Sequence, residues 1–180
     1  MVIRTCYRPT RRRGMSTDDL IKMVHANFSR IYLGGIPSLL NDNGGAFLSF
    51  ICTLTGTEAL AGFLKPKDKN GPRFKAFVKD YFPTPLDAQS DTLWRFRNAA
   101  VHGFSPGPYK VTHHNSHLHL TTDDGLTLLN AEDFYAALVM AAKKYFDALQ
   151  GDPSLRAAFE ERAKDPDTGV LTVGPLTGKP

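Results

Sequence analysis

Hydrophobic residues recur three or four positions apart along most of the chain, which is the spacing of helices with one buried face. Behind the capping residue Ser16, this spacing predicts a first helix that runs to Leu33. Gly34-Gly35 should end that helix, and the Pro, Asn, Asp and Gly content of residues 36–45 predicts a loop. Further helices are predicted over residues 46–64, 71–81, 86–102, 130–149 and 153–164. Prolines and glycines separate them.

The spacing of hydrophobic residues changes from helical to alternating over residues 109–129, where Val111, Leu118 and Leu120 alternate with polar residues. Asn115-Ser116 and the Asp-Asp-Gly run at 123–125 have turn composition, so we expect two or three short antiparallel strands. The predicted fold class is therefore mainly α. It is an up-and-down bundle of four to five helices with a small antiparallel β insert after the helix over 86–102.

The size and composition of the chain fit one domain. With 180 residues, of which 42% are hydrophobic, it can bury a single core. We assign this domain to residues 16–164, between a basic, disordered leader at 1–15 and a flexible tail at 165–180. The two cysteines cannot form a disulfide framework, which favours the cytoplasm. The apolar stretch at 46–64 contains Glu58, so we expect a buried helix rather than a membrane span, and no membrane partner.

The excess of basic over acidic residues comes from the first residues of the chain. The formal charge is +4, but five of the 22 basic residues precede Met15, which leaves 17 basic against 18 acidic residues. An arginine-rich arm could hold nucleic acid loosely. We favour the simpler alternatives, a disordered leader or a true start at Met15.

The helix over 86–102 ends in the run Phe-Arg-Asn-Ala-Ala-Val-His-Gly at 96–103. We expect Gly103 to end it in a left-handed conformation. On an ideal helix Asn98 and His102 lie on one side, opposite the apolar stripe that contains Phe96. Arg97 lies about 140° from His102 by the same helical geometry. Their side chains can still converge if the last turn loosens or if a second copy of the helix faces the first.

Arg97-Asn98, with His102 five positions after the arginine, resembles the motif of the HEPN superfamily. The resemblance implies a helical bundle that pairs as a homodimer through the motif helix, and a metal-independent endoribonuclease without a cofactor. It makes Arg97 the phosphate-stabilising residue, Asn98 the polar residue beside it and His102 the acid-base group. It also implies RNA as the substrate, a possible regulatory protein partner, and a role in defence, stress or toxin-like control.

One position departs from the toxin-antitoxin subgroup of that superfamily. There a tyrosine two positions after the histidine accepts nucleotide modification, whereas this chain has Phe104, which has no hydroxyl. Two alternatives to catalysis stay open. The chain could be a non-catalytic helical homodimer that binds RNA or a protein. Alternatively, Arg97 and His102 could simply interact with the last carbonyls of their helix.

Four histidines, at positions 113, 114, 117 and 119, raise the possibility of a metal site. If Asn115-Ser116 is a hairpin turn, His114 faces His117 across two strands. No carboxylate or cysteine has obvious ligand spacing, so we expect a polar hairpin face and assign no metal.

Two further residues, Glu58 and Trp94, are candidates for contact with the motif. A buried Glu58 requires a cation, for which Arg97 or Arg95 is the candidate, although a half-exposed glutamate without a partner is the more common case. Trp94 could stack a base or enter a dimer interface, but core packing is the simpler expectation.

Overall fold

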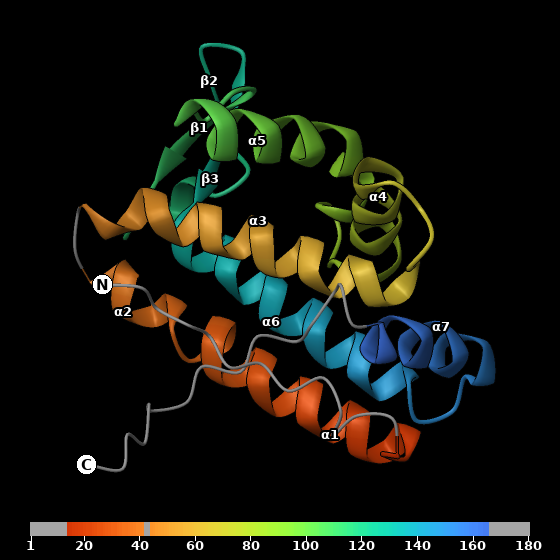
Figure 1. Cartoon of the computed structure of the whole chain (residues 1–180). Coiled ribbons are helices and arrows are strands. Elements are labelled where there is room, and N and C mark those ends of the chain that lie inside the picture. The colour runs from red at the N-terminus through yellow and green to blue at the C-terminus, as the bar shows by residue number, and fades with distance from the viewer. Residues whose placement is uncertain (1–13, 42–43, 166–180) are drawn as a thin grey trace, which may run out of the picture.

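A computed structural model describes residues 14–41 and 44–165 (Figure 1). The predicted leader at 1–15 and tail at 165–180 fall outside these residues, except for positions 14, 15 and 165. The α-helices of the described chain are α1 (Thr17–Phe28), α2 (Ile36–Leu40), α3 (Gly45–Leu64), α4 (Asn70–Tyr81), α5 (Ser90–Gly103), α6 (Ala131–Ala148) and α7 (Pro153–Lys164). The strands are β1 (Tyr109–Thr112), β2 (Thr122–Asp123) and β3 (Leu126–Asn130). The protein is therefore mainly helical, with a small sheet.

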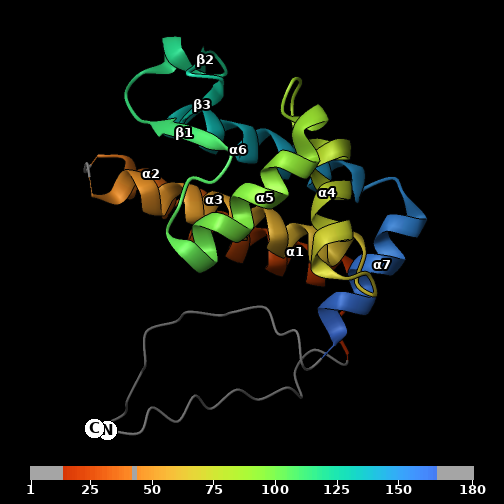
Figure 2. The same ribbon diagram turned by 90° about the horizontal axis from the view of Figure 1, so that it is seen from above.

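Helix α3 is the centre of the fold. It packs against α2, α4, α5, α6 and α7, and Figures 1 and 2 show it running through the middle of the molecule. Because neighbours cover it on several sides, it is apolar around most of its circumference. By length and composition it is also the one helix of the described residues that could cross a membrane, with 56% of its most apolar window buried by the rest of the protein. Its place in the core accounts for that composition.

Aromatic side chains connect α3 to the helices that flank it. The ring of Phe50 stacks on Phe134 of α6 at 5.8 Å and meets Phe96 of α5 edge-on at 5.7 Å. All three side chains are fully buried. Offset and edge-to-face contacts of this kind stabilise a core beyond the area they bury. Phe96 therefore anchors the helix that contains the Arg-Asn-His motif.

The predicted helices are present with bounds close to those expected, but the segment 36–45 is not entirely a loop. Residues Ile36–Leu40 form α2, with Pro37 in its first turn, a position where the missing N–H of proline costs nothing. Gly34-Gly35 also does not directly follow the end of α1. The chain continues from α1 into a π-helical turn, Ser29–Leu33, before these glycines.

The sheet is mixed, with strand order β1-β3-β2. The antiparallel prediction is correct for β2 and β3 but wrong for β1, which pairs in parallel with β3 and places Thr112 beside Asn130. Asn115-Ser116 is not a hairpin turn, and Ser116–Leu118 is a 3-10 turn. The physical reason is a buried polar contact. The N–H of Asn115 donates to Oδ1 of Asn130, which is 1% exposed, and this holds the chain along β3 instead of folding it back on β1.

Candidate functional site: the motif at the end of helix α5

The three motif side chains meet near the C-terminal end of α5. Nη1 of Arg97 lies 3.3 Å from Oδ1 of Asn98 and 3.1 Å from Nε2 of His102. Arginine has donors and no acceptor, so Nε2 of His102 must accept this hydrogen bond with its lone pair. The proton of the neutral imidazole is then on Nδ1. His102 is exposed whereas the side chain of Arg97 is mostly buried, so the pair lies where the protein interior meets solvent.

This convergence takes place within one chain. The sequence suggested a loosened last turn or a second copy of the helix as ways to bring the side chains together. Neither is needed, because α5 stays helical through Gly103 and the contact is made within one chain. The long side chain of Arg97 spans the angular separation, since its guanidinium stands several bonds away from the helix surface.

Glu58 of α3 fixes the other edge of the guanidinium. One carboxylate oxygen, Oε2, accepts from Nε of Arg97 at 2.7 Å and lies 2.6 Å from Nη2. The two side chains are only 13% and 14% exposed. Of the alternatives considered for Glu58, the pair with Arg97 is therefore the one that forms. Since Glu58 occupies Nε and Nη2, Nη1 is the edge that faces Asn98 and His102.

Trp94 supports Arg97 from a third direction. The indole lies 5.5 Å from Cζ of Arg97 and 5.4 Å from the ring of Phe74 in α4. A side chain at Gly71 would come within 3.1 Å of this indole, so α4 approaches Trp94 closely. Trp94 thus packs between two helices, as the simpler expectation had it, and its contact with Arg97 is a cation–π interaction.

The end of the motif helix differs from the prediction. Gly103 was expected to adopt the left-handed conformation, but it remains helical and Phe104 takes that conformation, with φ of 48°. The N–H groups of Phe104 and Ser105 both donate to the carbonyl of Ala99, and a left-handed residue at the helix end allows such a closure. As a result the ring of Phe104 is 77% exposed, two residues from His102.

The four clustered histidines do not share one face. The predicted register of His114 against His117 is wrong, because the hairpin does not form. His119 accepts the backbone N–H of Asn130 at Nδ1, and burial lowers the pKa of its imidazole. His113 and His114 instead lie beside Glu132 in the first turn of α6.

No family model, curated protein or solved structure matches this chain. Its function is therefore inferred from the arrangement of its own residues.

Sequence reasoning singled out Arg97, Asn98 and His102, and the structure brings them together. Glu58 completes the group, and its signal in the sequence is a lone carboxylate in an otherwise apolar helix. Glu132 was missed, since it lies 18 positions from His114 and in a different element.

Proposed function

We propose that this protein is a HEPN-like endoribonuclease that cleaves RNA without a metal ion. His102 is the acid-base group, Arg97 binds the phosphate, and Asn98 positions the guanidinium. The observation that carries the proposal is the single nitrogen, Nη1 of Arg97, within hydrogen-bond distance of both Asn98 and His102. One imidazole and one guanidinium therefore border the same small volume, which is what phosphodiester cleavage requires.

The chemistry begins when an incoming phosphate displaces Nη1 of Arg97 from Nε2 of His102, which frees the lone pair of that nitrogen. The lone pair on Nε2 of His102 takes the proton of a ribose 2′-hydroxyl as its oxygen attacks phosphorus. The bond from phosphorus to the 5′-oxygen then breaks, protonated His102 returns its proton to that oxygen, and a 2′,3′-cyclic phosphate remains. Arg97 stabilises the negative charge that develops on the phosphate oxygens, since its N–H donors match them in geometry.

Glu58 supports this assignment by restricting the orientation of Arg97. Its carboxylate engages Nε and Nη2, so the guanidinium presents Nη1 to the motif. A phosphate that enters competes with Asn98 and His102 for this one edge. The exposed ring of Phe104 next to the site offers a surface on which a base can stack.

The proposal also covers the assembly of the protein and its biological role. The helices would form an up-and-down bundle, and two chains would pair through the exposed side of α5, so that two motifs line one cleft. RNA is the substrate, a regulatory protein partner restrains the activity, and the role is toxin-like or defensive in the cytoplasm. These parts rest on the resemblance of Arg97, Asn98 and His102 to the HEPN motif.

Incubation of the purified protein with mixed RNA in the presence of a chelator tests the proposal. We expect cleavage products that end in cyclic phosphate. His102→Ala and Arg97→Ala should each reduce the rate by about a hundredfold or more. His117→Ala, which removes an exposed histidine outside the motif, is the matched control and should cleave at the unaltered rate.

Two results would overturn the proposal. RNA binding without cleavage would favour the non-catalytic homodimer instead. Cleavage that stops in chelator, or that survives in His102→Ala, would assign the activity to other residues.

A further inference from the structure

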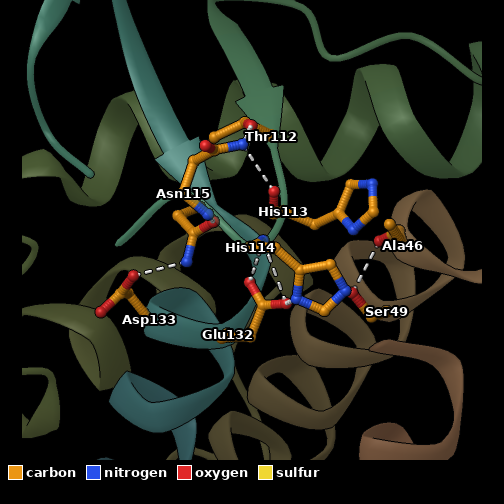
Figure 3. A network of polar contacts seen from close by, with 9 residues as sticks. Ala46, Ser49, Thr112, His113, His114, Asn115, Glu132 and Asp133 are labelled. Atoms are coloured by element: carbon orange, nitrogen blue, oxygen red, sulfur yellow. Dashed lines mark hydrogen bonds and ion pairs between the residues drawn. The ribbon is translucent and has the colours of Figure 1, made fainter. Parts of the chain in front are cut away.

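A second group of side chains with ligand chemistry lies where β1 ends and α6 begins. His113, His114 and Glu132 each offer one nitrogen or oxygen atom, and these atoms all lie within 4.8 Å of one another. The two imidazole rings are 4.6 Å apart, and Nδ1 of His114 is 2.9 Å from Oε1 of Glu132 (Figure 3). Among the described residues it is the one grouping of this kind.

The backbone holds the group in place. Both oxygens of Glu132 accept the N–H of His114, at 3.1 and 3.2 Å, so the carboxylate is tied to the histidine segment. Asn115 adds a second tie, because its side chain donates to Oγ1 of Thr112 and to the carbonyl of His113. The parallel register of β1 and β3 delivers this segment to the start of α6. Ligands fixed by such contacts lose little freedom when they bind an ion.

One nitrogen in the group has no partner. Nδ1 of His113 is inaccessible to solvent, and no hydrogen bond reaches it from any residue that the structure describes. A buried polar atom without a partner is costly, and its lone pair is available to a cation. The other two ligands are accessible, since the side chain of His114 is 59% exposed and that of Glu132 is 32% exposed. An ion can therefore reach the group from solvent.

The ligand set selects the class of ion. Two imidazoles and one carboxylate suit zinc and its neighbours among the transition metals, whereas magnesium and calcium prefer sets made of oxygen. In a tetrahedral zinc site, ligand atoms about 2.0–2.1 Å from the ion lie roughly 3.4 Å apart. The observed separations, up to 4.8 Å, are wider than this, so an ion must draw the three ligand atoms together when it binds. Three protein ligands leave a coordination position open for water, as in zinc sites that perform chemistry.

We propose that His113, His114 and Glu132 bind a divalent transition-metal ion, with zinc as the principal ion, in a site with an open coordination position. The ion replaces the hydrogen bond between His114 and Glu132 with coordination to both. It also supplies the missing partner of His113. This site is separate from the motif of α5 and does not depend on RNA cleavage.

Calorimetric titration of the metal-free, untagged protein with Zn²⁺ tests the site, and visible absorption with Co²⁺ reports its geometry. We expect one ion per chain and a tetrahedral or five-coordinate cobalt spectrum. His113→Ala, His114→Ala and Glu132→Gln should each weaken binding by at least about tenfold. His117→Ala, four residues or fewer from the ligand histidines but outside the group, should bind as the unaltered protein does.

Thermal unfolding provides a second readout for any variant that loses structure. Zn²⁺ should raise the unfolding temperature of the unaltered protein and of His117→Ala, but not that of Glu132→Gln. Absence of binding at millimolar Zn²⁺, or equal loss of affinity in His117→Ala, overturns the site. So does unchanged affinity in all three ligand variants. None of these results bears on RNA cleavage in chelator, so the two proposals fail or succeed separately.

Discussion

Nη1 of Arg97 lies 3.1 Å from Nε2 of His102, five residues further along the same helix. Because a guanidinium only donates, this contact fixes which imidazole nitrogen has the lone pair. We predict that neutral His102 carries its proton on Nδ1. Long-range nitrogen–proton NMR correlation on the histidine rings measures this directly. A dominant Nε2–H form of His102 would contradict the contact.

The pair between Glu58 and Arg97 should matter more to stability than an ion pair at the surface. Glu58→Ala leaves a largely buried guanidinium without its counter-charge, which we expect to lower the free energy of unfolding by about 3 kcal/mol. Glu161 pairs with Lys67 at the surface, where the side chains are 48% and 81% exposed. Glu161→Ala should therefore cost less than about 1 kcal/mol. Urea unfolding of both variants makes the comparison, and equal losses would refute it.

Two buried tyrosines should respond in opposite ways to loss of their hydroxyl. Tyr109 donates to Oε1 of Gln89 at 2.7 Å, so Tyr109→Phe should lower stability by about 1 kcal/mol. The hydroxyl of Tyr145 is buried with no hydrogen-bond partner in residues 14–41 and 44–165. Tyr145→Phe should then be neutral or stabilising by up to about 1 kcal/mol. Thermal or urea unfolding measures both, and a larger loss in Tyr145→Phe would show that its hydroxyl is bonded.

The left-handed conformation of Phe104 predicts a stabilising substitution. A residue with a side chain pays about 1 kcal/mol for this conformation, whereas glycine adopts it freely. Phe104→Gly should therefore raise the free energy of unfolding by about that amount. Phe104→Ala removes the same exposed ring but keeps the strain, so its stability should stay close to that of the unaltered protein. Equal gains in the two variants would attribute the effect to the ring and not to the backbone.

His119 should make stability depend on pH. Burial lowers the pKa of its imidazole below the ordinary value of 6.5, against a smaller opposing effect of Asp133. In the range just below 6.5 the unfolded chain thus binds this proton more readily than the folded protein does. Stability then falls as the pH is lowered from 6.5 towards the folded pKa.

His119→Gln lacks this titration, so its disadvantage against the unaltered protein should shrink between about pH 7.5 and about pH 5. Unfolding curves across this range, in chelator, provide the measurement. His117→Gln is the control, because His117 is exposed and should show no such change. A constant difference between His119→Gln and the unaltered protein would exclude His119 as the source.

Local patterns were enough to predict most of the helices but not α2 or the sheet. Apolar periodicity and the Gly and Pro positions define α3 to α7, because those signals lie within each helix. The pairing of β1 depends instead on a contact between Asn115 and Asn130, which no period in the sequence encodes. The motif could be identified for the same reason that the helices could, since Arg97 and His102 are neighbours in sequence. Glu132 could not be assigned to the histidines, because only the parallel register brings it to them.

The hydroxyl of Tyr109 reaches back across α5 to Gln89, and its ring meets Phe96 edge-on at 5.4 Å. Between these contacts Gly107 lies so close to Ala99 that an added methyl group would come within 2.8 Å. These contacts therefore hold the segment from Gln89 to Tyr109 at its two ends and near its middle. We therefore expect α5 to move as one rigid unit with β1, the strand that follows it. The width of any groove along α5 then depends on how this rigid unit is placed against its neighbours, and not on bending of α5 itself.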